Sequence, residues 1–138
     1  MNRYVAGLGC RRGCKTAELA ELLDHVLDEI GAPRAALIGL ASLQRKCAEP
    51  ALRELARQRA LPLAGFDEAT LAGYADRLET PSVRVRQATG CAGIAEAAAL
   101  ALADRWGDAP GELRVGKRVS VRASVALAEV RAREDTPA

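Results

Sequence analysis

The sequence predicts an α/β fold: a three-layer sandwich in which helices cover both faces of a mixed, mostly parallel sheet of about five strands. Short apolar runs alternate along the chain with helical patterns, as in βαβ units. The second of these runs is apolar at successive positions, which is typical of a strand that is buried on both faces. The last two runs have no helix between them, and this predicts one antiparallel pair.

The first predicted strand covers residues 4–8, and a helix opens at Thr16. Between Leu19 and Ile30 the apolar side chains recur with the spacing of one helical face. Thr16 is a candidate N-cap, and Gly31 is a candidate residue just beyond the helix. The acidic residues of this segment occupy the opposite face, which we expect to be solvated.

Residues 35–41 form the second predicted strand, and residues 42–48 a loop. Pro50 suits the first turn of the helix that follows. A short third strand is expected over residues 61–63, where Pro62 indicates either an edge strand or the start of a strand because it lacks a backbone N–H.

Asp67 is a candidate cap for the next helix. Residues 81–90 fit either a strand or a helical turn. An alanine-rich helix follows Gly93, and its small side chains allow close packing against a sheet. Residues 112–115 and 123–130 are the last two predicted strands, with a turn between them at 116–118 or 120–123.

Length and composition limit the possible classes of function. The chain has 138 residues, of which 28% are charged and 49% hydrophobic, so we expect residues 1–138 to form a single globular domain. No apolar run approaches the roughly 20 residues of a membrane span. Aromatic residues make up only 3%, too few to stack bases, so we expect no nucleic-acid partner and no membrane association.

The cysteines and the single histidine do not form a recognisable metal motif. Cys10 and Cys14 are spaced CxxxC, and His25 lies among acidic residues on a predicted helix. Zinc sites use other spacings, so we expect no metal, no cofactor and free thiols. The stretch before Cys10 is too short for the apolar core of an export signal, and we therefore expect a cytoplasmic protein.

In open α/β sheets, ligands collect beyond the carboxyl ends of the strands. Three segments of this sequence lie at such positions, next to predicted strands or helices. They are Gly7–Gly13, Ser42–Lys46 and Thr89–Gly93, the last followed by Glu96 in the alanine-rich helix. Glycines in the first segment permit a tight turn and a close approach to an anion at the helix N-terminus. Basic residues gather at residues 1–15 and again at residues 111–122.

Other chemistries have weaker support. The glycines are spaced GxGxxxG, and no acidic residue ends the second predicted strand, so a dinucleotide site is disfavoured. Cys10 could be activated by neighbouring cations, but a small buried residue is the preferred interpretation. Lys46 and Glu96 are candidate catalytic groups, and Glu96 equally fits a carboxylate that stabilises the start of a helix.

Five segments in the same order resemble the family formed by the cobalamin-biosynthesis protein CobE and the carboxy-terminal domain of CbiG. The opening Gly7–Gly13 looks like the GxGCRxG of this family. The other similar segments are Ala41-Ser42 with Lys46 and Glu49; Leu55-Ala56, Pro62-Leu63 and Phe66; Thr89-Gly90 with Gly93–Glu96 and Ala98–Leu100; and Lys117 with Ser124–Ala128.

The resemblance implies a role in cobalamin biosynthesis. It points to binding of a tetrapyrrole, such as a precorrin or a ligand like hydrogenobyrinic acid, by a carrier or accessory factor of the aerobic route. Other enzymes of the pathway are possible partners. The alternative is an enzyme acting on a precorrin, as CbiG opens a lactone, but CbiG carries additional amino-terminal sequence. A third possibility is a scaffold that docks through the acidic face of the first helix.

Corrin intermediates carry carboxylates around an apolar ring, and arginine and lysine bind carboxylates well. Apolar side chains at the strand ends would contact the ring. The predicted ligand-binding residues are Gly9, Cys10, Arg11, Arg12, Gly13, Lys15, Ser42, Lys46, Gly90, Glu96 and Lys117. This prediction requires cations from separate segments to meet at one pocket.

Overall fold

The structure is a computed structural model, and it describes residues 2–77 and 91–132. Short 3-10 turns lie at Arg34–Ala36, Gln44–Lys46 and Ala75–Arg77. The helices and strands, in chain order, are β1 (Arg3–Cys10), α1 (Thr16–Glu29), β2 (Leu37–Leu43), α2 (Pro50–Arg59), β3 (Leu63–Phe66), α3 (Glu68–Ala72), α5 (Cys91–Trp106), β4 (Ala109–Val119) and β5 (Ala123–Arg131).

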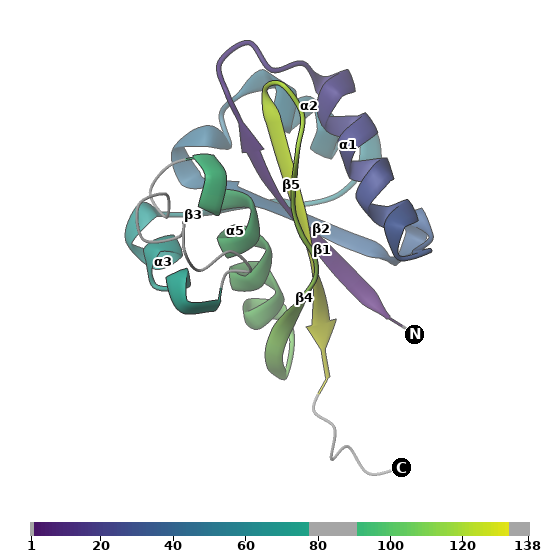
Figure 1. Cartoon of the computed structure of the whole chain (residues 1–138), viewed down its shortest axis with the longest axis vertical. Helices are drawn as coiled ribbons and strands as arrows, with labels where there is room; N and C mark the ends of the chain where they lie inside the picture. Colours follow the sequence, from purple (N-terminus) through teal and green to yellow (C-terminus); the bar gives the residue numbers. More distant parts are fainter. Residues whose placement is uncertain (1, 78–90, 133–138) are drawn as a thin grey trace.

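The strands form one sheet in the order β3-β2-β1-β5-β4 (Figure 1). The β1–β2 and β2–β3 pairs are parallel, and the β1–β5 and β5–β4 pairs are antiparallel. Two pairs are thus parallel and two are antiparallel, but four of the five strands run in the same direction and only β5 is reversed. The ends of β1 to β4 and the start of β5 consequently lie at one edge of the sheet, called here the carboxyl edge.

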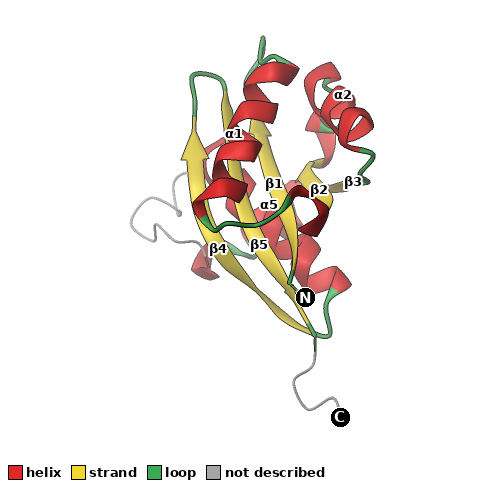
Figure 2. Cartoon of the chain, turned by 90° about the vertical axis from the view of Figure 1, so that its right-hand side faces the viewer, coloured by secondary structure: helices red, strands yellow, loops and turns green. Residues whose placement is uncertain are grey.

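Helices cover both faces of the sheet, which confirms the predicted three-layer arrangement. Figure 2 shows α1 and α2 on one side of the sheet and α5 on the other. Side chains of β1 alternate between the two cores: Ala6 and Leu8 pack with α1 and α2, whereas Val5 packs with α5. Each β1 residue from Tyr4 to Cys10 is buried, as expected for a strand between two layers.

The alanine-rich helix α5 lies close to β1 because residue 7 is a glycine. A Cβ atom built at Gly7 would lie 1.8 Å from the carbonyl oxygen of Ala95 and 2.7 Å from the backbone nitrogen of Ala99. The helix is buried around its whole circumference from Ile94 to Ala103. Near the end of this helix Arg105 is exposed, and its guanidinium lies 4.4 Å from the ring centroid of Phe66.

Several predicted boundaries shift by a few residues. Lys15, and not Thr16, is the N-cap of α1, and it makes no side-chain capping hydrogen bond. Strand β2 begins at Leu37 and continues through Leu43, because Ser42 pairs with Gly65 of β3. The loop that was predicted to begin at residue 42 is therefore shorter.

The other residues that were expected at the ends of helices are confirmed in these positions. Gly31 has a φ of +65° just beyond α1, and Pro50 occupies the first turn of α2. The backbone N–H of Thr70 donates to Oδ1 of Asp67 at 2.8 Å, which confirms the predicted cap. The prediction for residues 81–90 lies outside the described residues.

Strand β4 is longer than the four predicted residues, and it joins β5 through a turn at residues 120–122. The backbone N–H of Ser120 donates to the carbonyl oxygen of Ala123 at 2.9 Å. Strand β4 is the outer strand on one side of the sheet and β3 the outer strand on the other. Strand β3 covers Leu63–Phe66 instead of the predicted residues 61–63, so Pro62 directly precedes the strand. None of the helices described here has the length and apolar character that crossing a membrane would require.

Candidate functional site

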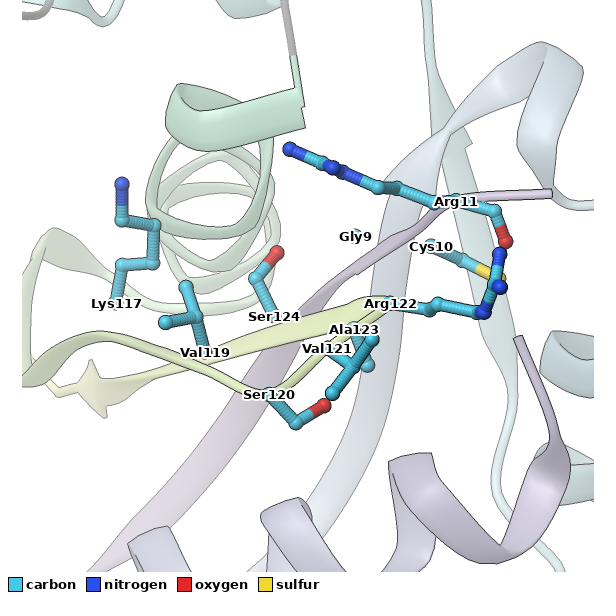
Figure 3. A pocket seen from close by; sticks show the side chains of 10 residues that line it. All are labelled: Gly9, Cys10, Arg11, Lys117, Val119, Ser120, Val121, Arg122, Ala123 and Ser124. Atoms are coloured by element: carbon cyan, nitrogen blue, oxygen red, sulfur yellow. The ribbon is translucent and has the colours of Figure 1, made fainter. Parts of the chain in front are cut away.

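A pocket of about 310 Å³ opens at the carboxyl edge, where the β1–α1 loop meets the β4–β5 turn (Figure 3). Strands β1 and β5 are paired up to Cys10 and Ala123, so the register brings the two segments together. The residues that line the pocket are Gly9, Cys10, Arg11, Lys117, Val119, Ser120, Val121, Arg122, Ala123 and Ser124.

Strand alternation decides which of these side chains point together. Cys10 belongs to the core under α1, so the neighbouring Arg11 faces the other side of the sheet. Ser124 lies two residues from Ala126 and four from Ala128, which packs in the core under α5. Figure 3 shows the side chains of Lys117 and Ser124 extending upward from β4 and β5, and the side chain of Arg11 extending across the view above these strands. Two cations from opposite ends of the chain thus share one side of the pocket.

The side chain of Arg122 points away from these groups and forms a hydrogen bond with the β1–α1 loop. Its Nη1 donates to the carbonyl oxygen of Arg12 at 3.0 Å, and its carbonyl oxygen accepts the backbone N–H of Arg11 at 2.8 Å. Gly13, with a φ of +84°, lets the loop pass the Arg122 guanidinium, since a Cβ there would lie 3.3 Å from Nη1. Arg12 and Gly13 therefore hold the β1–α1 loop against Arg122 and do not themselves line the pocket.

Glu18 of α1 holds the β4–β5 turn from the other side. Its carboxylate accepts the backbone N–H of Arg122 at 2.7 Å and the hydroxyl of Ser120. The Ser120 hydroxyl, followed by the Arg122 N–H, lowers the pKa of Glu18. The turn is consequently attached to α1 by an ionised carboxylate.

Other acidic residues of α1 also have partners within the chain, which corrects the expectation of a simply solvated face. Asp24 forms ion pairs with Arg34 at 2.9 Å and with Arg59 at 3.0 Å. Glu29 pairs with Arg118 of β4 at 3.0 Å. This acidic face helps to hold α1 to its neighbours.

Glu96 lies in the second turn of α5 and points into the protein. Its side chain is only 2% exposed, and one carboxylate oxygen accepts the backbone N–H of Lys117 at 2.8 Å. Gly7 makes this contact possible because it lets α5 approach the sheet. Glu96 does not line the pocket, but it fixes the backbone from which the Lys117 side chain projects.

The other predicted site residues lie elsewhere or have structural roles. Ser42 is buried, and its hydroxyl donates to the carbonyl oxygen of Leu8 at 2.7 Å. Lys15 lines a separate, open hollow with Glu54 of α2. Lys46 ends the 3-10 turn after β2 and is not among the residues that line the pocket. Gly90 lies outside the described residues.

The thiols of Cys14 and Cys47 are protonated at neutral pH. Burial, followed by a hydrogen bond with Cys10, raises the pKa of Cys14 to about 12. Burial also raises the pKa of Cys47. Within residues 2–77 and 93–132, no three histidine, cysteine or acidic side chains are grouped so that they could hold a metal ion.

The sequence analysis missed six residues of the pocket lining, all in or next to the β4–β5 turn. A signal was present, because residues 111–122 are rich in basic side chains. Only the antiparallel pairing of β5 with β1 shows that this turn reaches the carboxyl edge. The missed residues that line the pocket are Val119, Ser120, Val121, Arg122, Ala123 and Ser124.

Comparison with known proteins gives a consistent result. The family model described as "Cobalamin synthesis G C-terminus" matches residues 4–128. Protein CobE of a Sinorhizobium species is 41% identical over 124 residues, which cover 90% of this chain and 78% of that protein. A crystal structure of CobE, a protein from the cobalamin (vitamin B12) biosynthetic pathway, superposes with a TM-score of 0.82 at 45% identity, covering 93% of this chain and 90% of the other.

Two further crystal structures are similar at lower identity. The cobalamin biosynthesis protein chiG of Agrobacterium tumefaciens matches with a TM-score of 0.66 at 26% identity, over 91% of this chain and 96% of that one. A cobalamin biosynthesis protein G homologue of Sulfolobus solfataricus matches with a TM-score of 0.71 at 19% identity. That match covers 94% of this chain but only 37% of the other, and it shows a shared fold.

Proposed function

Because this chain belongs to the family of the cobalamin synthesis G carboxy-terminal domain and is a protein of cobalamin biosynthesis, we propose that it binds a corrinoid or precorrin intermediate at the carboxyl-edge pocket. It acts as a carrier or accessory factor of the pathway. The observation that carries the proposal is the meeting of Arg11 and Lys117 on one side of a single pocket.

The chemistry of the pocket suits a ligand with several carboxylates. Arg11 offers a planar fork of N–H donors for a bidentate contact, and Lys117 offers a compact positive charge. No acidic side chain is among the residues that line this pocket. Each charge-assisted hydrogen bond contributes about 1.5–3 kcal/mol, so two or three of them give substantial affinity before any apolar contact is counted.

A binding role accounts for the described groups better than catalysis does. Glu96 and Lys46, the candidate catalytic residues, are not pocket-lining residues, and Glu96 accepts a backbone N–H instead of facing the open space. The Cys10 thiol lines the pocket, but it belongs to the buried core. The pocket lining described here contains no carboxylate and no histidine, and we assign its one lysine, Lys117, to a carboxylate of the ligand.

The proposal is tested by a spectroscopic titration with hydrogenobyrinic acid at low salt. We expect saturable binding by the wild type, and a loss of about 10- to 100-fold in affinity for both Arg11→Ala and Lys117→Ala. Arg114→Ala is the matched control, because Arg114 is an exposed cation of β4 outside the pocket. Absence of saturable binding, or equal affinities for all four proteins, would contradict the proposal.

Mass spectrometry of a precorrin incubated with the protein separates binding from catalysis. We expect the precorrin to be recovered unchanged. Turnover by the wild type that is abolished in Glu96→Gln would overturn the carrier role and favour an enzyme.

A further inference from the structure

Two exposed valines set the β4–β5 turn apart from the rest of the surface. Val119 is 64% exposed and Val121 is 81% exposed, and apart from Trp106 they are the only large apolar side chains exposed among the described residues. Both line the carboxyl-edge pocket. Val119 is the last residue of β4, where its β-branched shape is ordinary but its exposure is not, and Val121 lies in the turn itself, where glycine and small polar residues are favoured.

The turn holds these valines in a fixed position. Arg122, in this turn, forms three hydrogen bonds. Its backbone N–H donates to the Glu18 carboxylate at 2.7 Å, and its carbonyl oxygen accepts the backbone N–H of Arg11 at 2.8 Å. Its guanidinium donates to the carbonyl oxygen of Arg12 at 3.0 Å. A surface that is already ordered loses little conformational entropy when a ligand covers it. The valines are therefore a preformed contact surface.

The size of the pocket indicates how a large ligand would enter. A volume of about 310 Å³ lies at the small end of the range for ligand pockets, which is about 300–1,000 Å³. The pocket accommodates one edge of a macrocycle, and the remaining part of the ring lies outside. Lys117 and Val119 are two residues apart on β4, so cation and apolar side chain project from the same region of the strand (Figure 3).

From these observations we infer that the ring of the ligand enters edge-on, with carboxylates of the inserted edge on Arg11 and Lys117 and its apolar face against Val119 and Val121. The site then selects rigid, amphiphilic polycarboxylates over small polycarboxylates that lack an apolar ring. This inference rests on the proposed function and adds the residues that determine its specificity. Charge alone would not discriminate the two classes of ligand, because both carry carboxylates.

The experiment compares two probes, hydrogenobyrinic acid and citrate, by calorimetric titration. The test variant is the double substitution Val119→Thr and Val121→Thr, which keeps the β-branched shape and replaces one methyl group of each side chain by a hydroxyl. We expect the affinity for hydrogenobyrinic acid to fall about tenfold. We expect the weak binding of citrate, and the salt dependence of both titrations, to remain as in the wild type.

Arg11→Ala is the contrasting variant, and it is expected to weaken both probes and to reduce the salt dependence. Thermal unfolding of each variant confirms that the fold is retained. If the valine double variant binds hydrogenobyrinic acid as the wild type does while Arg11→Ala does not, the inference is wrong and the proposed function stands. If the wild type binds neither probe, both are overturned.

Discussion

Replacement of Gly7 by alanine tests the packing that brings α5 to the carboxyl edge. The new Cβ would lie 1.8 Å from the carbonyl oxygen of Ala95, whereas ordinary contacts begin at 3.4 Å. The obstacle is backbone, so no side chain can turn aside. The helix must retreat by about 1.5 Å, and its contacts with the sheet are lost along the buried stretch from Ile94 to Ala103.

Overpacking of a core costs about 1–3 kcal/mol, and a clash between two backbones belongs at the upper end of that range. We therefore expect Gly7→Ala to lower the free energy of unfolding by about 3 kcal/mol. For a domain of this size the melting temperature would fall by about 10 °C.

Gly39→Ala is the matched control, because it makes the same substitution in the adjacent strand β2. There the new Cβ would meet the indole ring of Trp106 at 2.5 Å, and that side chain is 38% exposed and can move outward. Both variants reduce the entropy of the unfolded chain equally, so the difference between them isolates the clash. We expect Gly39→Ala to cost about 1 kcal/mol in urea unfolding. Equal losses of stability in the two variants would refute the role assigned to Gly7.

Three further predictions concern individual side chains. Burial opposes ionisation of Asp104, but hydrogen bonds from Arg77, Gly111 and Tyr74 outweigh burial and lower the pKa of this carboxyl group. The ionised Asp104 therefore stabilises the folded protein at pH values above the unfolded pKa of about 3.9, and this contribution is lost as the pH falls through the folded pKa. The wild type should exceed Asp104→Asn in unfolding free energy at pH 7, and a difference that persists undiminished at pH 2 would contradict this reasoning. Glu18→Ala should accelerate amide hydrogen exchange at Arg122, because its N–H loses its acceptor, and unchanged exchange would disprove the attachment of the turn to α1. Cys14, with a pKa of about 12, should be alkylated by iodoacetamide at pH 8 far more slowly than free cysteine, and equal rates would argue against its burial.

Local patterns in the sequence predicted the elements that depend on local physics. The apolar spacing from Leu19 to Ile30 corresponds to α1, and Asp67 caps α3 as expected. Pro62 directly precedes β3, which agrees with the expected position of proline at the start of a strand, and β3 is an outer strand. Arg11 and Lys117 were selected as cations near predicted strand ends, and both line the pocket.

The features that were missed depend on tertiary pairing. Strand β2 extends past Ser42 because the hydroxyl of that residue finds a buried carbonyl on β1, and no pattern within residues 35–48 contains this partner. Lys46 lies in the 3-10 turn that follows directly, and it is not among the residues that line the pocket. Val121 and Arg122 could be recognised only once β5 was known to run antiparallel beside β1.

The most direct test of the ligand site is an NMR titration of the labelled protein with hydrogenobyrinic acid, followed through the backbone amides. We predict that the largest shifts occur at residues 9–11, 117 and 119–124, and that amides near the separate hollow at Lys15 and Glu54 stay in place. Shifts that cluster at that hollow, or a spectrum that does not change at saturating ligand, would contradict a binding site at the carboxyl edge.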